Sequence, residues 1–198
     1  MSEILDIVDE HGNPTGQTVE REKAHTQGIM HRTSHVWIVR KKEEKIQVLL
    51  QKRSINKESF PGCFDISSAG HIPAGCGYVE SALRELSEEL GVHAYEEDLI
   101  FCGDRLVLWD DKFNGKVFCD RQYSRVFALW LSQDEKDFIL QPEEVDAVLW
   151  MDLEQCMEAV KQNTISHCVV LEELEMVYAA VNDEEDASIS WCCYKKIL

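Results

Sequence analysis

The sequence predicts a mixed α/β domain. Two β-rich runs, 34–40 and 45–53, are separated by the charged segment KKEEK and are typical of paired strands in one sheet. A helical pattern follows between Gly77 and Gly91, and strand-like and helical runs continue to alternate after it. This alternation indicates a sheet with helices packed on it, in a single domain that covers residues 1–198.

Turn residues and apolar patterning give the other elements. We expect an N-terminal hairpin at about 3–22 around a Gly-Asn-Pro turn, followed by a core at about 30–163. Further strands are expected at 98–109, 116–132 and 147–153, the first two joined by a turn in DDKFNG. Helices are expected at 153–162 and 165–181. A C-terminal helix and tail occupy about 164–198, and the tail has no assignment.

The helix before Gly91 carries three acidic residues at helical spacing. Glu85, Glu88 and Glu89 fall within an arc of about 100°. The opposite side is apolar and consists of Val79, Ala82, Leu83, Leu86 and Leu90. Like charges at this spacing repel one another, and a divalent cation with oxygen ligands would offset that repulsion. The preceding loop contains Gly70, Gly75 and Gly77, which permit tight turns and a close approach to a ligand.

The overall charge restricts the partners of the chain. With 20 basic and 37 acidic residues, the formal net charge is −17, which disfavours nucleic acid and anionic membranes as partners. The start MSEILDIVDEHGN lacks the features of a signal peptide, and no stretch is long and apolar enough to span a membrane, so we expect a cytoplasmic protein. The eight cysteines contain no C-x-x-C pair, which favours free thiols over a zinc site.

Residues 70–92, GHIPAGCGYVESALRELSEELGV, resemble the Nudix box: glycine, five residues, glutamate, seven residues, then R-E-U-x-E-E-x-G-U, where U is a bulky aliphatic residue. The matching positions are Gly70, Arg84, Glu85, Leu86, Glu88, Glu89, Gly91 and Val92. Cys76 departs from the pattern, because the family has there a glutamate that supports the box by pairing with the arginine. We expect Cys76 to be structural rather than a catalytic thiol, and Glu80, four residues before Arg84, to replace the pairing.

The resemblance implies a Nudix α/β/α sandwich with a mixed sheet and a loop-helix-loop catalytic box. It also implies metal-dependent hydrolysis of a small organic diphosphate, nucleoside or otherwise X-linked. Glu85, Glu88 and Glu89 would hold Mg²⁺ or Mn²⁺, which neutralises the diphosphate and lowers the pKa of a bound water. Either Glu85 or Glu144 would act as general base, and Arg84 would orient the neighbouring carboxylates.

The first two-thirds of the chain resembles the Nudix branch that includes isopentenyl diphosphate isomerase. The likeness lies in the segments AHTQGIMH, LLQKRSINKESFPG, SSAGH and QPEEVDAVLW. It implies that Arg53 and Lys57 bind the diphosphate. Isomerase chemistry is disfavoured, because Ala69 replaces the isomerase's cysteine and Gln122 replaces its glutamate, and neither side chain transfers a proton near neutral pH.

The same resemblance implies a candidate second metal site at His25, His31, His71 and Asp120. His25 and His31 are six residues apart in an expected loop, and the alternative of ordinary structural histidines stays open. His35 belongs to a predicted strand and has no assigned role.

Two alternatives to a hydrolase remain. Cys76 favours a non-catalytic Nudix module that binds or senses a nucleotide or sugar diphosphate, and isopentenyl diphosphate isomerase is the other alternative. We expect Trp37, Trp109 and Trp150 in the core rather than stacked against a base.

Overall fold

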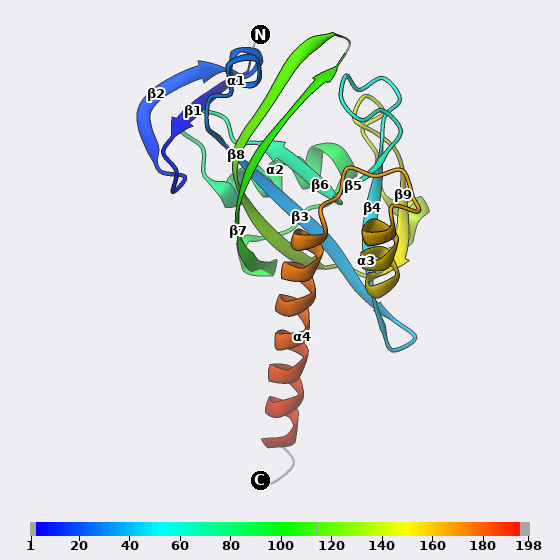
Figure 1. Cartoon of the computed structure of the whole chain (residues 1–198). Helices are drawn as coiled ribbons and strands as arrows, with labels where there is room; N and C mark the ends of the chain where they lie inside the picture. Colours follow the sequence, from blue (N-terminus) through cyan, green and yellow to red (C-terminus); the bar gives the residue numbers. More distant parts are fainter. Residues whose placement is uncertain (1–2, 114, 195–198) are drawn as a thin grey trace.

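The computed structural model describes the backbone of residues 3–113 and 115–194, and their side chains except those of 116 and 183–194. The N-terminal hairpin consists of β1 (Ile4–Val8) and β2 (Pro14–Glu20) and leads into helix α1 (Arg21–Gln27). The main sheet comprises β3 (His31–Lys42), β4 (Lys45–Arg53), β5 (Phe64–Asp65), β6 (Ser68–His71), β7 (Leu99–Phe113), β8 (Lys116–Trp130) and β9 (Val145–Asp152). The other helices are α2 (Tyr78–Leu90), α3 (Leu153–Gln162) and α4 (Leu171–Tyr194). Figure 1 shows their arrangement.

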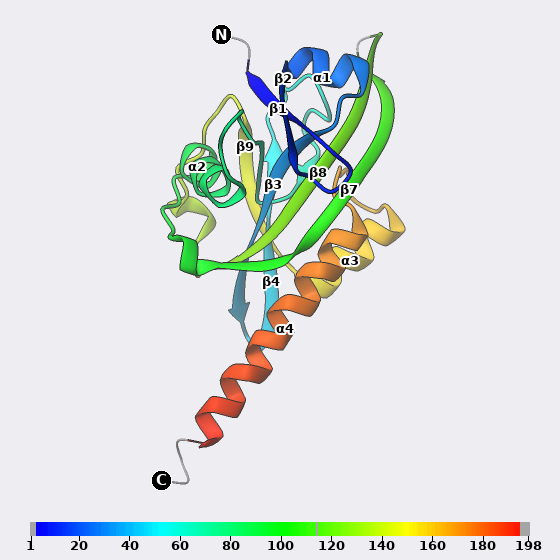
Figure 2. The same ribbon diagram turned by 90° about the vertical axis from the view of Figure 1, so that its left-hand side faces the viewer.

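The main sheet is mixed. Its strands follow the order β5-β4-β3-β8-β7, with β6 also paired to β3 and β9 to β4. The long pairing of β3 with β8 is parallel, and the other pairings of this sheet are antiparallel. Helix α2 lies on one side of the sheet, and α3 and α4 lie on the other (Figure 2). The predicted α/β/α sandwich with a mixed sheet is therefore confirmed.

Strand β3 contributes to both hydrophobic cores, because successive side chains of a strand point to opposite faces. Val36 and Ile38 pack in the core that contains Leu86 of α2. Trp37 and Val39 pack in the core beneath α3 and α4. With both faces covered, β3 is buried along ten consecutive residues, and it forms the rigid centre from which the site segments extend.

Several sequence predictions match the observed elements closely. The hairpin, β3, β4 and the two long strands β7 and β8 form where expected, and α3 has the predicted bounds. Trp37 and Trp150 are buried, as expected. Trp109, in contrast, is partly exposed on β7, so its assignment to the core was wrong.

Two helices differ from the prediction. His25 lies in α1 rather than in a loop; this helix has only seven residues and ends at Gly28, whose φ of 62° is left-handed, so it is too short for a clear periodicity. Helix α4 begins at Leu171, because the chain before it runs beside β5: the Phe64 amide donates to the Ser166 carbonyl and the Cys168 amide to the Phe64 carbonyl. It then continues through most of the unassigned tail, and the side chains of Cys192 and Cys193 lie outside the described part. No described helix is both long and apolar enough to cross a membrane.

Candidate active site

Helix α2 presents the acidic residues and is fixed at both ends. At its start the Gly77 amide donates to the Glu80 carboxylate at 3.3 Å. At its end Gly91 has a left-handed φ of 66°, as its predicted position after the helix requires, and a Cβ there would collide with Ile139. Because Glu80 caps the helix, it does not replace the missing box glutamate, and the expected pairing with Arg84 is not among the described contacts.

Arg84 instead pairs with two of the box carboxylates. Its Nη2 donates to Glu85 at 2.7 Å and its Nη1 donates to Glu88 at 2.8 Å. The Cys76 carbonyl accepts a hydrogen bond from Arg32 at 3.1 Å, so the loop at this position is held through its backbone. The substitution of the box glutamate therefore leaves both the loop and the arginine anchored.

Glu85 lies across Gly70 of β6. A Cβ at Gly70 would overlap the Glu85 side chain, so a residue without a side chain is required for this close approach. Burial raises the pKa of Glu85, and the adjacent Arg84 guanidinium opposes that rise. The close packing of strand and helix thus keeps this carboxylate partly shielded from water beside a cation.

Glu89 is the most buried of the three box acids. Its side chain is only 5% exposed, whereas that of Glu88 is exposed to solvent. The acidic residues that the sequence places on one arc of the helix are therefore divided between the interior and the solvent. One carboxylate oxygen of Glu89, Oε2, has no hydrogen-bond partner. Burial, with the negative charges of Glu85 and Glu144, raises the pKa of Glu89 to about 8. A buried acid with an open oxygen next to other carboxylates fits a hard cation such as Mg²⁺.

Glu144 and Lys57 complete this side of the site. They form an ion pair, and both charges act on Glu89. The loop after β4 is joined to the loop before β9, because the Ser54 amide donates to the Glu144 carbonyl at 2.8 Å. A cation for phosphate oxygens is therefore held close to the acidic cluster.

Arg53 anchors the loop that carries Lys57. Its Nη1 donates to Asp65 at 2.8 Å and its Nη2 donates to the Ser59 carbonyl at 3.0 Å. These contacts engage the guanidinium on the protein itself, so its predicted contact with a diphosphate stays a prediction.

The predicted histidine cluster is brought together from three elements: His25 from α1, His31 from the start of β3, and His71 from the end of β6. One ligand atom of each lies within 4.8 Å of the others, and the Nε2 atoms of His25 and His71 are 3.0 Å apart. His31 Nδ1 donates to the Ile29 carbonyl at 2.8 Å, which leaves its Nε2 as an acceptor without a partner. Asp120 Oδ1 lies 3.6 Å from His25 Nδ1 and also has no hydrogen-bond partner.

The electrostatics of this cluster suit a metal. Burial lowers the pKa of His25 to about 3 and lowers those of His31 and His71, so the imidazoles are neutral and can act as ligands. Burial raises the pKa of Asp120 to about 6. Three neutral imidazoles with a nearby carboxyl group fit a divalent transition metal better than Mg²⁺.

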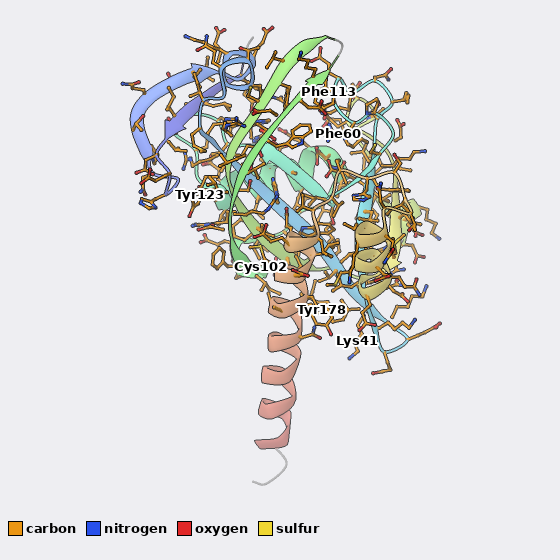
Figure 3. The ribbon with its side chains drawn as sticks, in the orientation of Figure 1. Lys41, Phe60, Cys102, Phe113, Tyr123 and Tyr178 are labelled. Atoms are coloured by element: carbon orange, nitrogen blue, oxygen red, sulfur yellow. The ribbon has the colours of Figure 1, made fainter. Side chains whose placement is uncertain are left out.

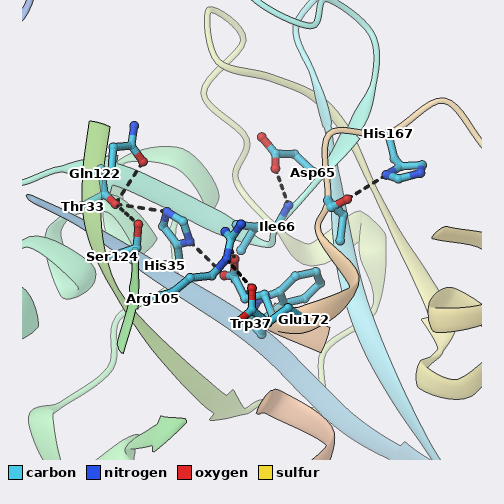
Figure 4. A network of polar contacts seen from close by, with 12 residues as sticks. Thr33, His35, Trp37, Asp65, Ile66, Arg105, Gln122, Ser124, His167 and Glu172 are labelled. Atoms are coloured by element: carbon cyan, nitrogen blue, oxygen red, sulfur yellow. Dashed lines mark hydrogen bonds and ion pairs between the residues drawn. The ribbon is translucent and has the colours of Figure 1, made fainter. Parts of the chain in front are cut away.

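A buried polar network lies next to this cluster and was not predicted (Figure 4). Glu173 of α4, 1% exposed, accepts from His35 at 2.9 Å and from Trp37 at 3.1 Å, and pairs with Arg105 at 3.4 Å. Nothing in the acidic sequence around Glu173 distinguishes it from its exposed neighbours. His35 offered the one usable signal, a polar residue within an apolar strand.

A second part of this network surrounds Thr33. Its hydroxyl lies 2.7 Å from that of Ser124 and 3.3 Å from the amide oxygen of Gln122. Gln122 of β8 is also the register partner of His31 of β3. The pairing of these two strands therefore places Gln122 beside the histidine cluster.

The fold and the site define a class of α/β/α proteins that present carboxylates on a loop-helix-loop against a glycine-containing strand. The model of the NUDIX domain matches residues 30–174. Nudix hydrolase 3 of Arabidopsis thaliana is 38% identical over 159 residues, 77% of this chain, and the match spans 20% of that longer protein. An uncharacterised Nudix hydrolase of Clostridium acetobutylicum is 33% identical over 77% of this chain and 71% of its own length. The chain therefore belongs to the Nudix family of hydrolases.

Other comparisons agree with this assignment. Isopentenyl-diphosphate Delta-isomerase 2 of Photorhabdus laumondii is 28% identical over 77% of this chain and 79% of its own length. The crystal structure of DR0079 from Deinococcus radiodurans superposes with a TM-score of 0.65 at 20% identity, covering 87% of this chain and 98% of that one. The Nudix domain of Shewanella oneidensis NrtR, solved with ADP ribose, gives 0.52 at 16% identity, covering 77% and 86%. At these identities the two structures support the fold alone.

Proposed function

We propose that the protein hydrolyses a small organic diphosphate with the help of a divalent metal ion. The observation that carries the proposal is the buried Glu89 carboxylate, which has an open oxygen and lies within the field of Glu85 and Glu144. Two like charges and burial make an ionised Glu89 unstable in isolation, and a bound cation would reverse that effect. The ion pair of Lys57 with Glu144 places an ammonium group beside the same acids.

Glu85 and Glu89 would hold Mg²⁺ or Mn²⁺, with Glu88 at the exposed edge of the site. The ion would neutralise the diphosphate and stabilise the charge that develops as the phosphoanhydride bond breaks. Arg84 fixes Glu85 and Glu88 through its two charge-assisted hydrogen bonds. Glu85 is therefore a ligand already held in position, and Glu89 offers an oxygen that has no other partner.

The chain's own residues supply phosphate binding and proton transfer. Lys57 exchanges its contact with Glu144 for the negatively charged phosphate oxygens, and the freed carboxylate can then accept the proton of the attacking water. Glu85 is the second candidate for this base, because its carboxylate lies in the same acidic cluster and is oriented by Arg84. The pH dependence of kcat in Glu144→Gln and Glu85→Gln distinguishes them: loss of the acidic limb identifies the base.

We also propose that His25, His31 and His71 form a second metal site, with Asp120 as a further ligand or as a partner of His25. The support is the three neutral imidazoles, whose ligand atoms lie within 4.8 Å of one another, and the unpartnered ring nitrogens of His25 and His31. Isomerase chemistry is not part of the proposal, because Ala69 has no transferable proton and the Gln122 amide oxygen is engaged by Thr33.

The test measures phosphate-bond hydrolysis in Mg²⁺ with nucleoside, sugar and isoprenoid diphosphates. Glu89→Gln is expected to lower turnover of the accepted compounds about 100-fold or more, since a metal-ligand or transition-state contact is usually worth several kcal/mol. Glu158→Gln on the exposed face of α3 is the matched control and should retain full activity. Equal turnover by wild type and Glu89→Gln would contradict the proposal, and tight binding without any turnover would select the non-catalytic module.

A further inference from the structure

Polar side chains form a continuous column along one face of β3 and β8, the face on which α4 packs. The polar column consists of His31, Thr33 and His35 on β3, and of Asp120, Gln122 and Ser124 on β8. In each strand these are alternate residues, so they point to the same side of the sheet. The parallel register places His31 beside Gln122, and Thr33 beside Ser124. The polar column therefore runs from the histidine cluster toward the C-terminal helix.

The residues between those of the polar column point to the other face of the sheet. Tyr123 faces the N-terminal hairpin, where a Cβ at Gly12 would collide with its ring (Figure 3). Ser34 is the register partner of Gly70, which lies against Glu85 of α2. The Ser34 hydroxyl is buried and has no hydrogen-bond partner among the described residues. The sheet thus separates the polar column from the helix that carries the box acids.

The hydroxyl group of Thr33 joins the members of the polar column to one another (Figure 4). Its Oγ1 lies 2.7 Å from Ser124 Oγ and 3.3 Å from His35 Nε2. It also donates to the Gln122 amide oxygen at 3.3 Å. On the other side of the imidazole, His35 Nδ1 donates to Glu173 at 2.9 Å. A hydrogen-bonded chain therefore begins at α4 and reaches Gln122.

The contact with Thr33 fixes the direction of the Gln122 amide. Asp120 lies two residues earlier on the same face of β8, so the NH₂ group of Gln122 is the end of the amide that can reach it. Burial raises the pKa of Asp120 to about 6, and a hydrogen bond from Gln122 opposes that rise. Only the NH₂ group of an amide can donate to a carboxylate, so both contacts require the same orientation. Asp120 Oδ1 stays open, 3.6 Å from His25 Nδ1.

We propose that Thr33 and Gln122 are positioning residues for the histidine metal site. This inference rests on the second metal site of the proposed function. Thr33 holds the Gln122 amide, and the amide holds Asp120 with one oxygen open toward His25. Gln122 therefore acts as a donor to the carboxylate and not as a metal ligand, since its oxygen is turned to Thr33.

The far end of the chain is anchored in the core. Glu173 is 1% exposed and is itself held by Trp37 and Arg105, so His35 presents its Nε2 to Thr33 in one orientation. Packing alone does not account for this arrangement. A buried hydroxyl or amide loses its hydration and regains that loss only through hydrogen bonds, whereas an apolar side chain of the same size fills the space without this cost. A polar column that ends at open ligand atoms indicates a role in holding those atoms.

The experiment measures Co²⁺ binding to the full chain by visible absorption, with excess Mg²⁺ present to occupy the box acids. Two substitutions of Thr33 separate its hydroxyl from its shape: Thr33→Val keeps the shape and removes the hydroxyl, and Thr33→Ser keeps the hydroxyl and removes the methyl group. Thr33→Val should weaken Co²⁺ binding about 10-fold or more and alter the absorption band, whereas Thr33→Ser should stay within about threefold of wild type. A packing role predicts the opposite order, because valine fills the site better than serine.

Two further variants test the path and the specificity of the effect. Gln122→Met interrupts the same chain at the next residue, so it should match the loss in Thr33→Val and provides the comparison if that variant does not fold. The double variant should bind Co²⁺ about as weakly as either single variant, because both changes break one chain. Ser34→Ala is the control on the opposite face of β3 and should bind Co²⁺ as wild type does.

The outcomes separate this inference from the proposed function. Wild-type affinity in Thr33→Val or Gln122→Met, equal losses in Thr33→Val and Thr33→Ser, or losses that multiply in the double variant would overturn the inference and leave the metal site in place. Equal Co²⁺ binding by wild type and His71→Asn would overturn the metal site, and the inference with it. These readouts do not depend on turnover, so a failure of the hydrolase proposal would leave the inference standing.

Discussion

Replacement of Glu89 by glutamine should change how the stability of the metal-free protein depends on pH. The wild-type carboxyl has a pKa of about 8 in the folded state against an ordinary value of 4.5, mainly because it is buried. A raised pKa means that the folded state binds the proton more tightly than the unfolded state. Below about pH 4.5 the carboxyl is protonated in both states and does not change the free energy of unfolding. As the pH rises from 4.5 toward 8, only the unfolded state releases the proton, so the free energy of unfolding falls.

The size of the effect follows from the two pKa values. Each pH unit between them lowers the free energy of unfolding by up to about 1.4 kcal/mol, and the slope is smaller close to either pKa. Wild type should therefore lose roughly 3.5 kcal/mol relative to Glu89→Gln between pH 5 and pH 8. A bound cation removes this loss because it favours the ionised carboxylate. Mg²⁺ at about 100 times its Kd should stabilise wild type by about 3 kcal/mol at pH 8.

The assay is urea unfolding of wild type, Glu89→Gln and the Glu158→Gln control at pH 5 and pH 8, first with EDTA and then with Mg²⁺. The difference between wild type and Glu89→Gln isolates this carboxyl from the other titrating groups, including the histidines. A difference that is the same at both pH values would show that Glu89 is not a buried acid of this kind. An equal response of both proteins to Mg²⁺ would show that Glu89 is not a ligand.

Three further substitutions test the remaining assignments. Lys57→Gln should raise the KM for a diphosphate about 10-fold or more with a smaller change in kcat, since it removes a ground-state phosphate contact. Steady-state kinetics measure both constants, and an unchanged KM would exclude the contact. His71→Asn should abolish stoichiometric Mn²⁺ or Co²⁺ binding at the histidine cluster, seen by spectroscopic titration, and unaltered binding would refute the site. Glu173→Gln should lower the free energy of unfolding by about 3 kcal/mol in urea, because His35 and Arg105 lose their buried partner, and a neutral result would contradict that role.

The sequence predicts best where one local pattern decides the structure. Helix α2 and its acids follow from the spacing of the box, and Gly91 follows from the need for a left-handed residue after the helix. The pattern does not reveal that Glu89 is buried while Glu88 is exposed. Both lie on the same arc of the helix, and their difference arises from how α2 packs against β6, which is a tertiary contact.

Contacts between distant segments could be predicted only where the family resemblance supplied them, as for the histidine cluster. His35 and Glu173 are separated by 138 positions, and each belongs to a local sequence that suggests an ordinary strand or an exposed helix. Ring contacts of Phe60 with Trp109 and Phe113, and of Phe113 with Phe118, join a loop to two strands in the same way. Trp109 was assigned to the core because large aromatic residues are usually buried, yet it is only partly buried on β7, beside the rings of Phe60 and Phe118.

Strand β6 links the two candidate sites, since its neighbouring residues face opposite sides of the sheet. Gly70 lies against Glu85 of α2, and His71 joins the histidine cluster. Gly70→Ala should therefore displace Glu85, because the new methyl group would occupy its place, and should lower diphosphate turnover about 100-fold. The same variant should keep the Mn²⁺ or Co²⁺ titration of the histidine cluster unchanged, since the substitution points to the other face. Joint loss of both functions would mean that β6 itself had moved, and an unaffected turnover would mean that the position of Glu85 does not matter for the reaction.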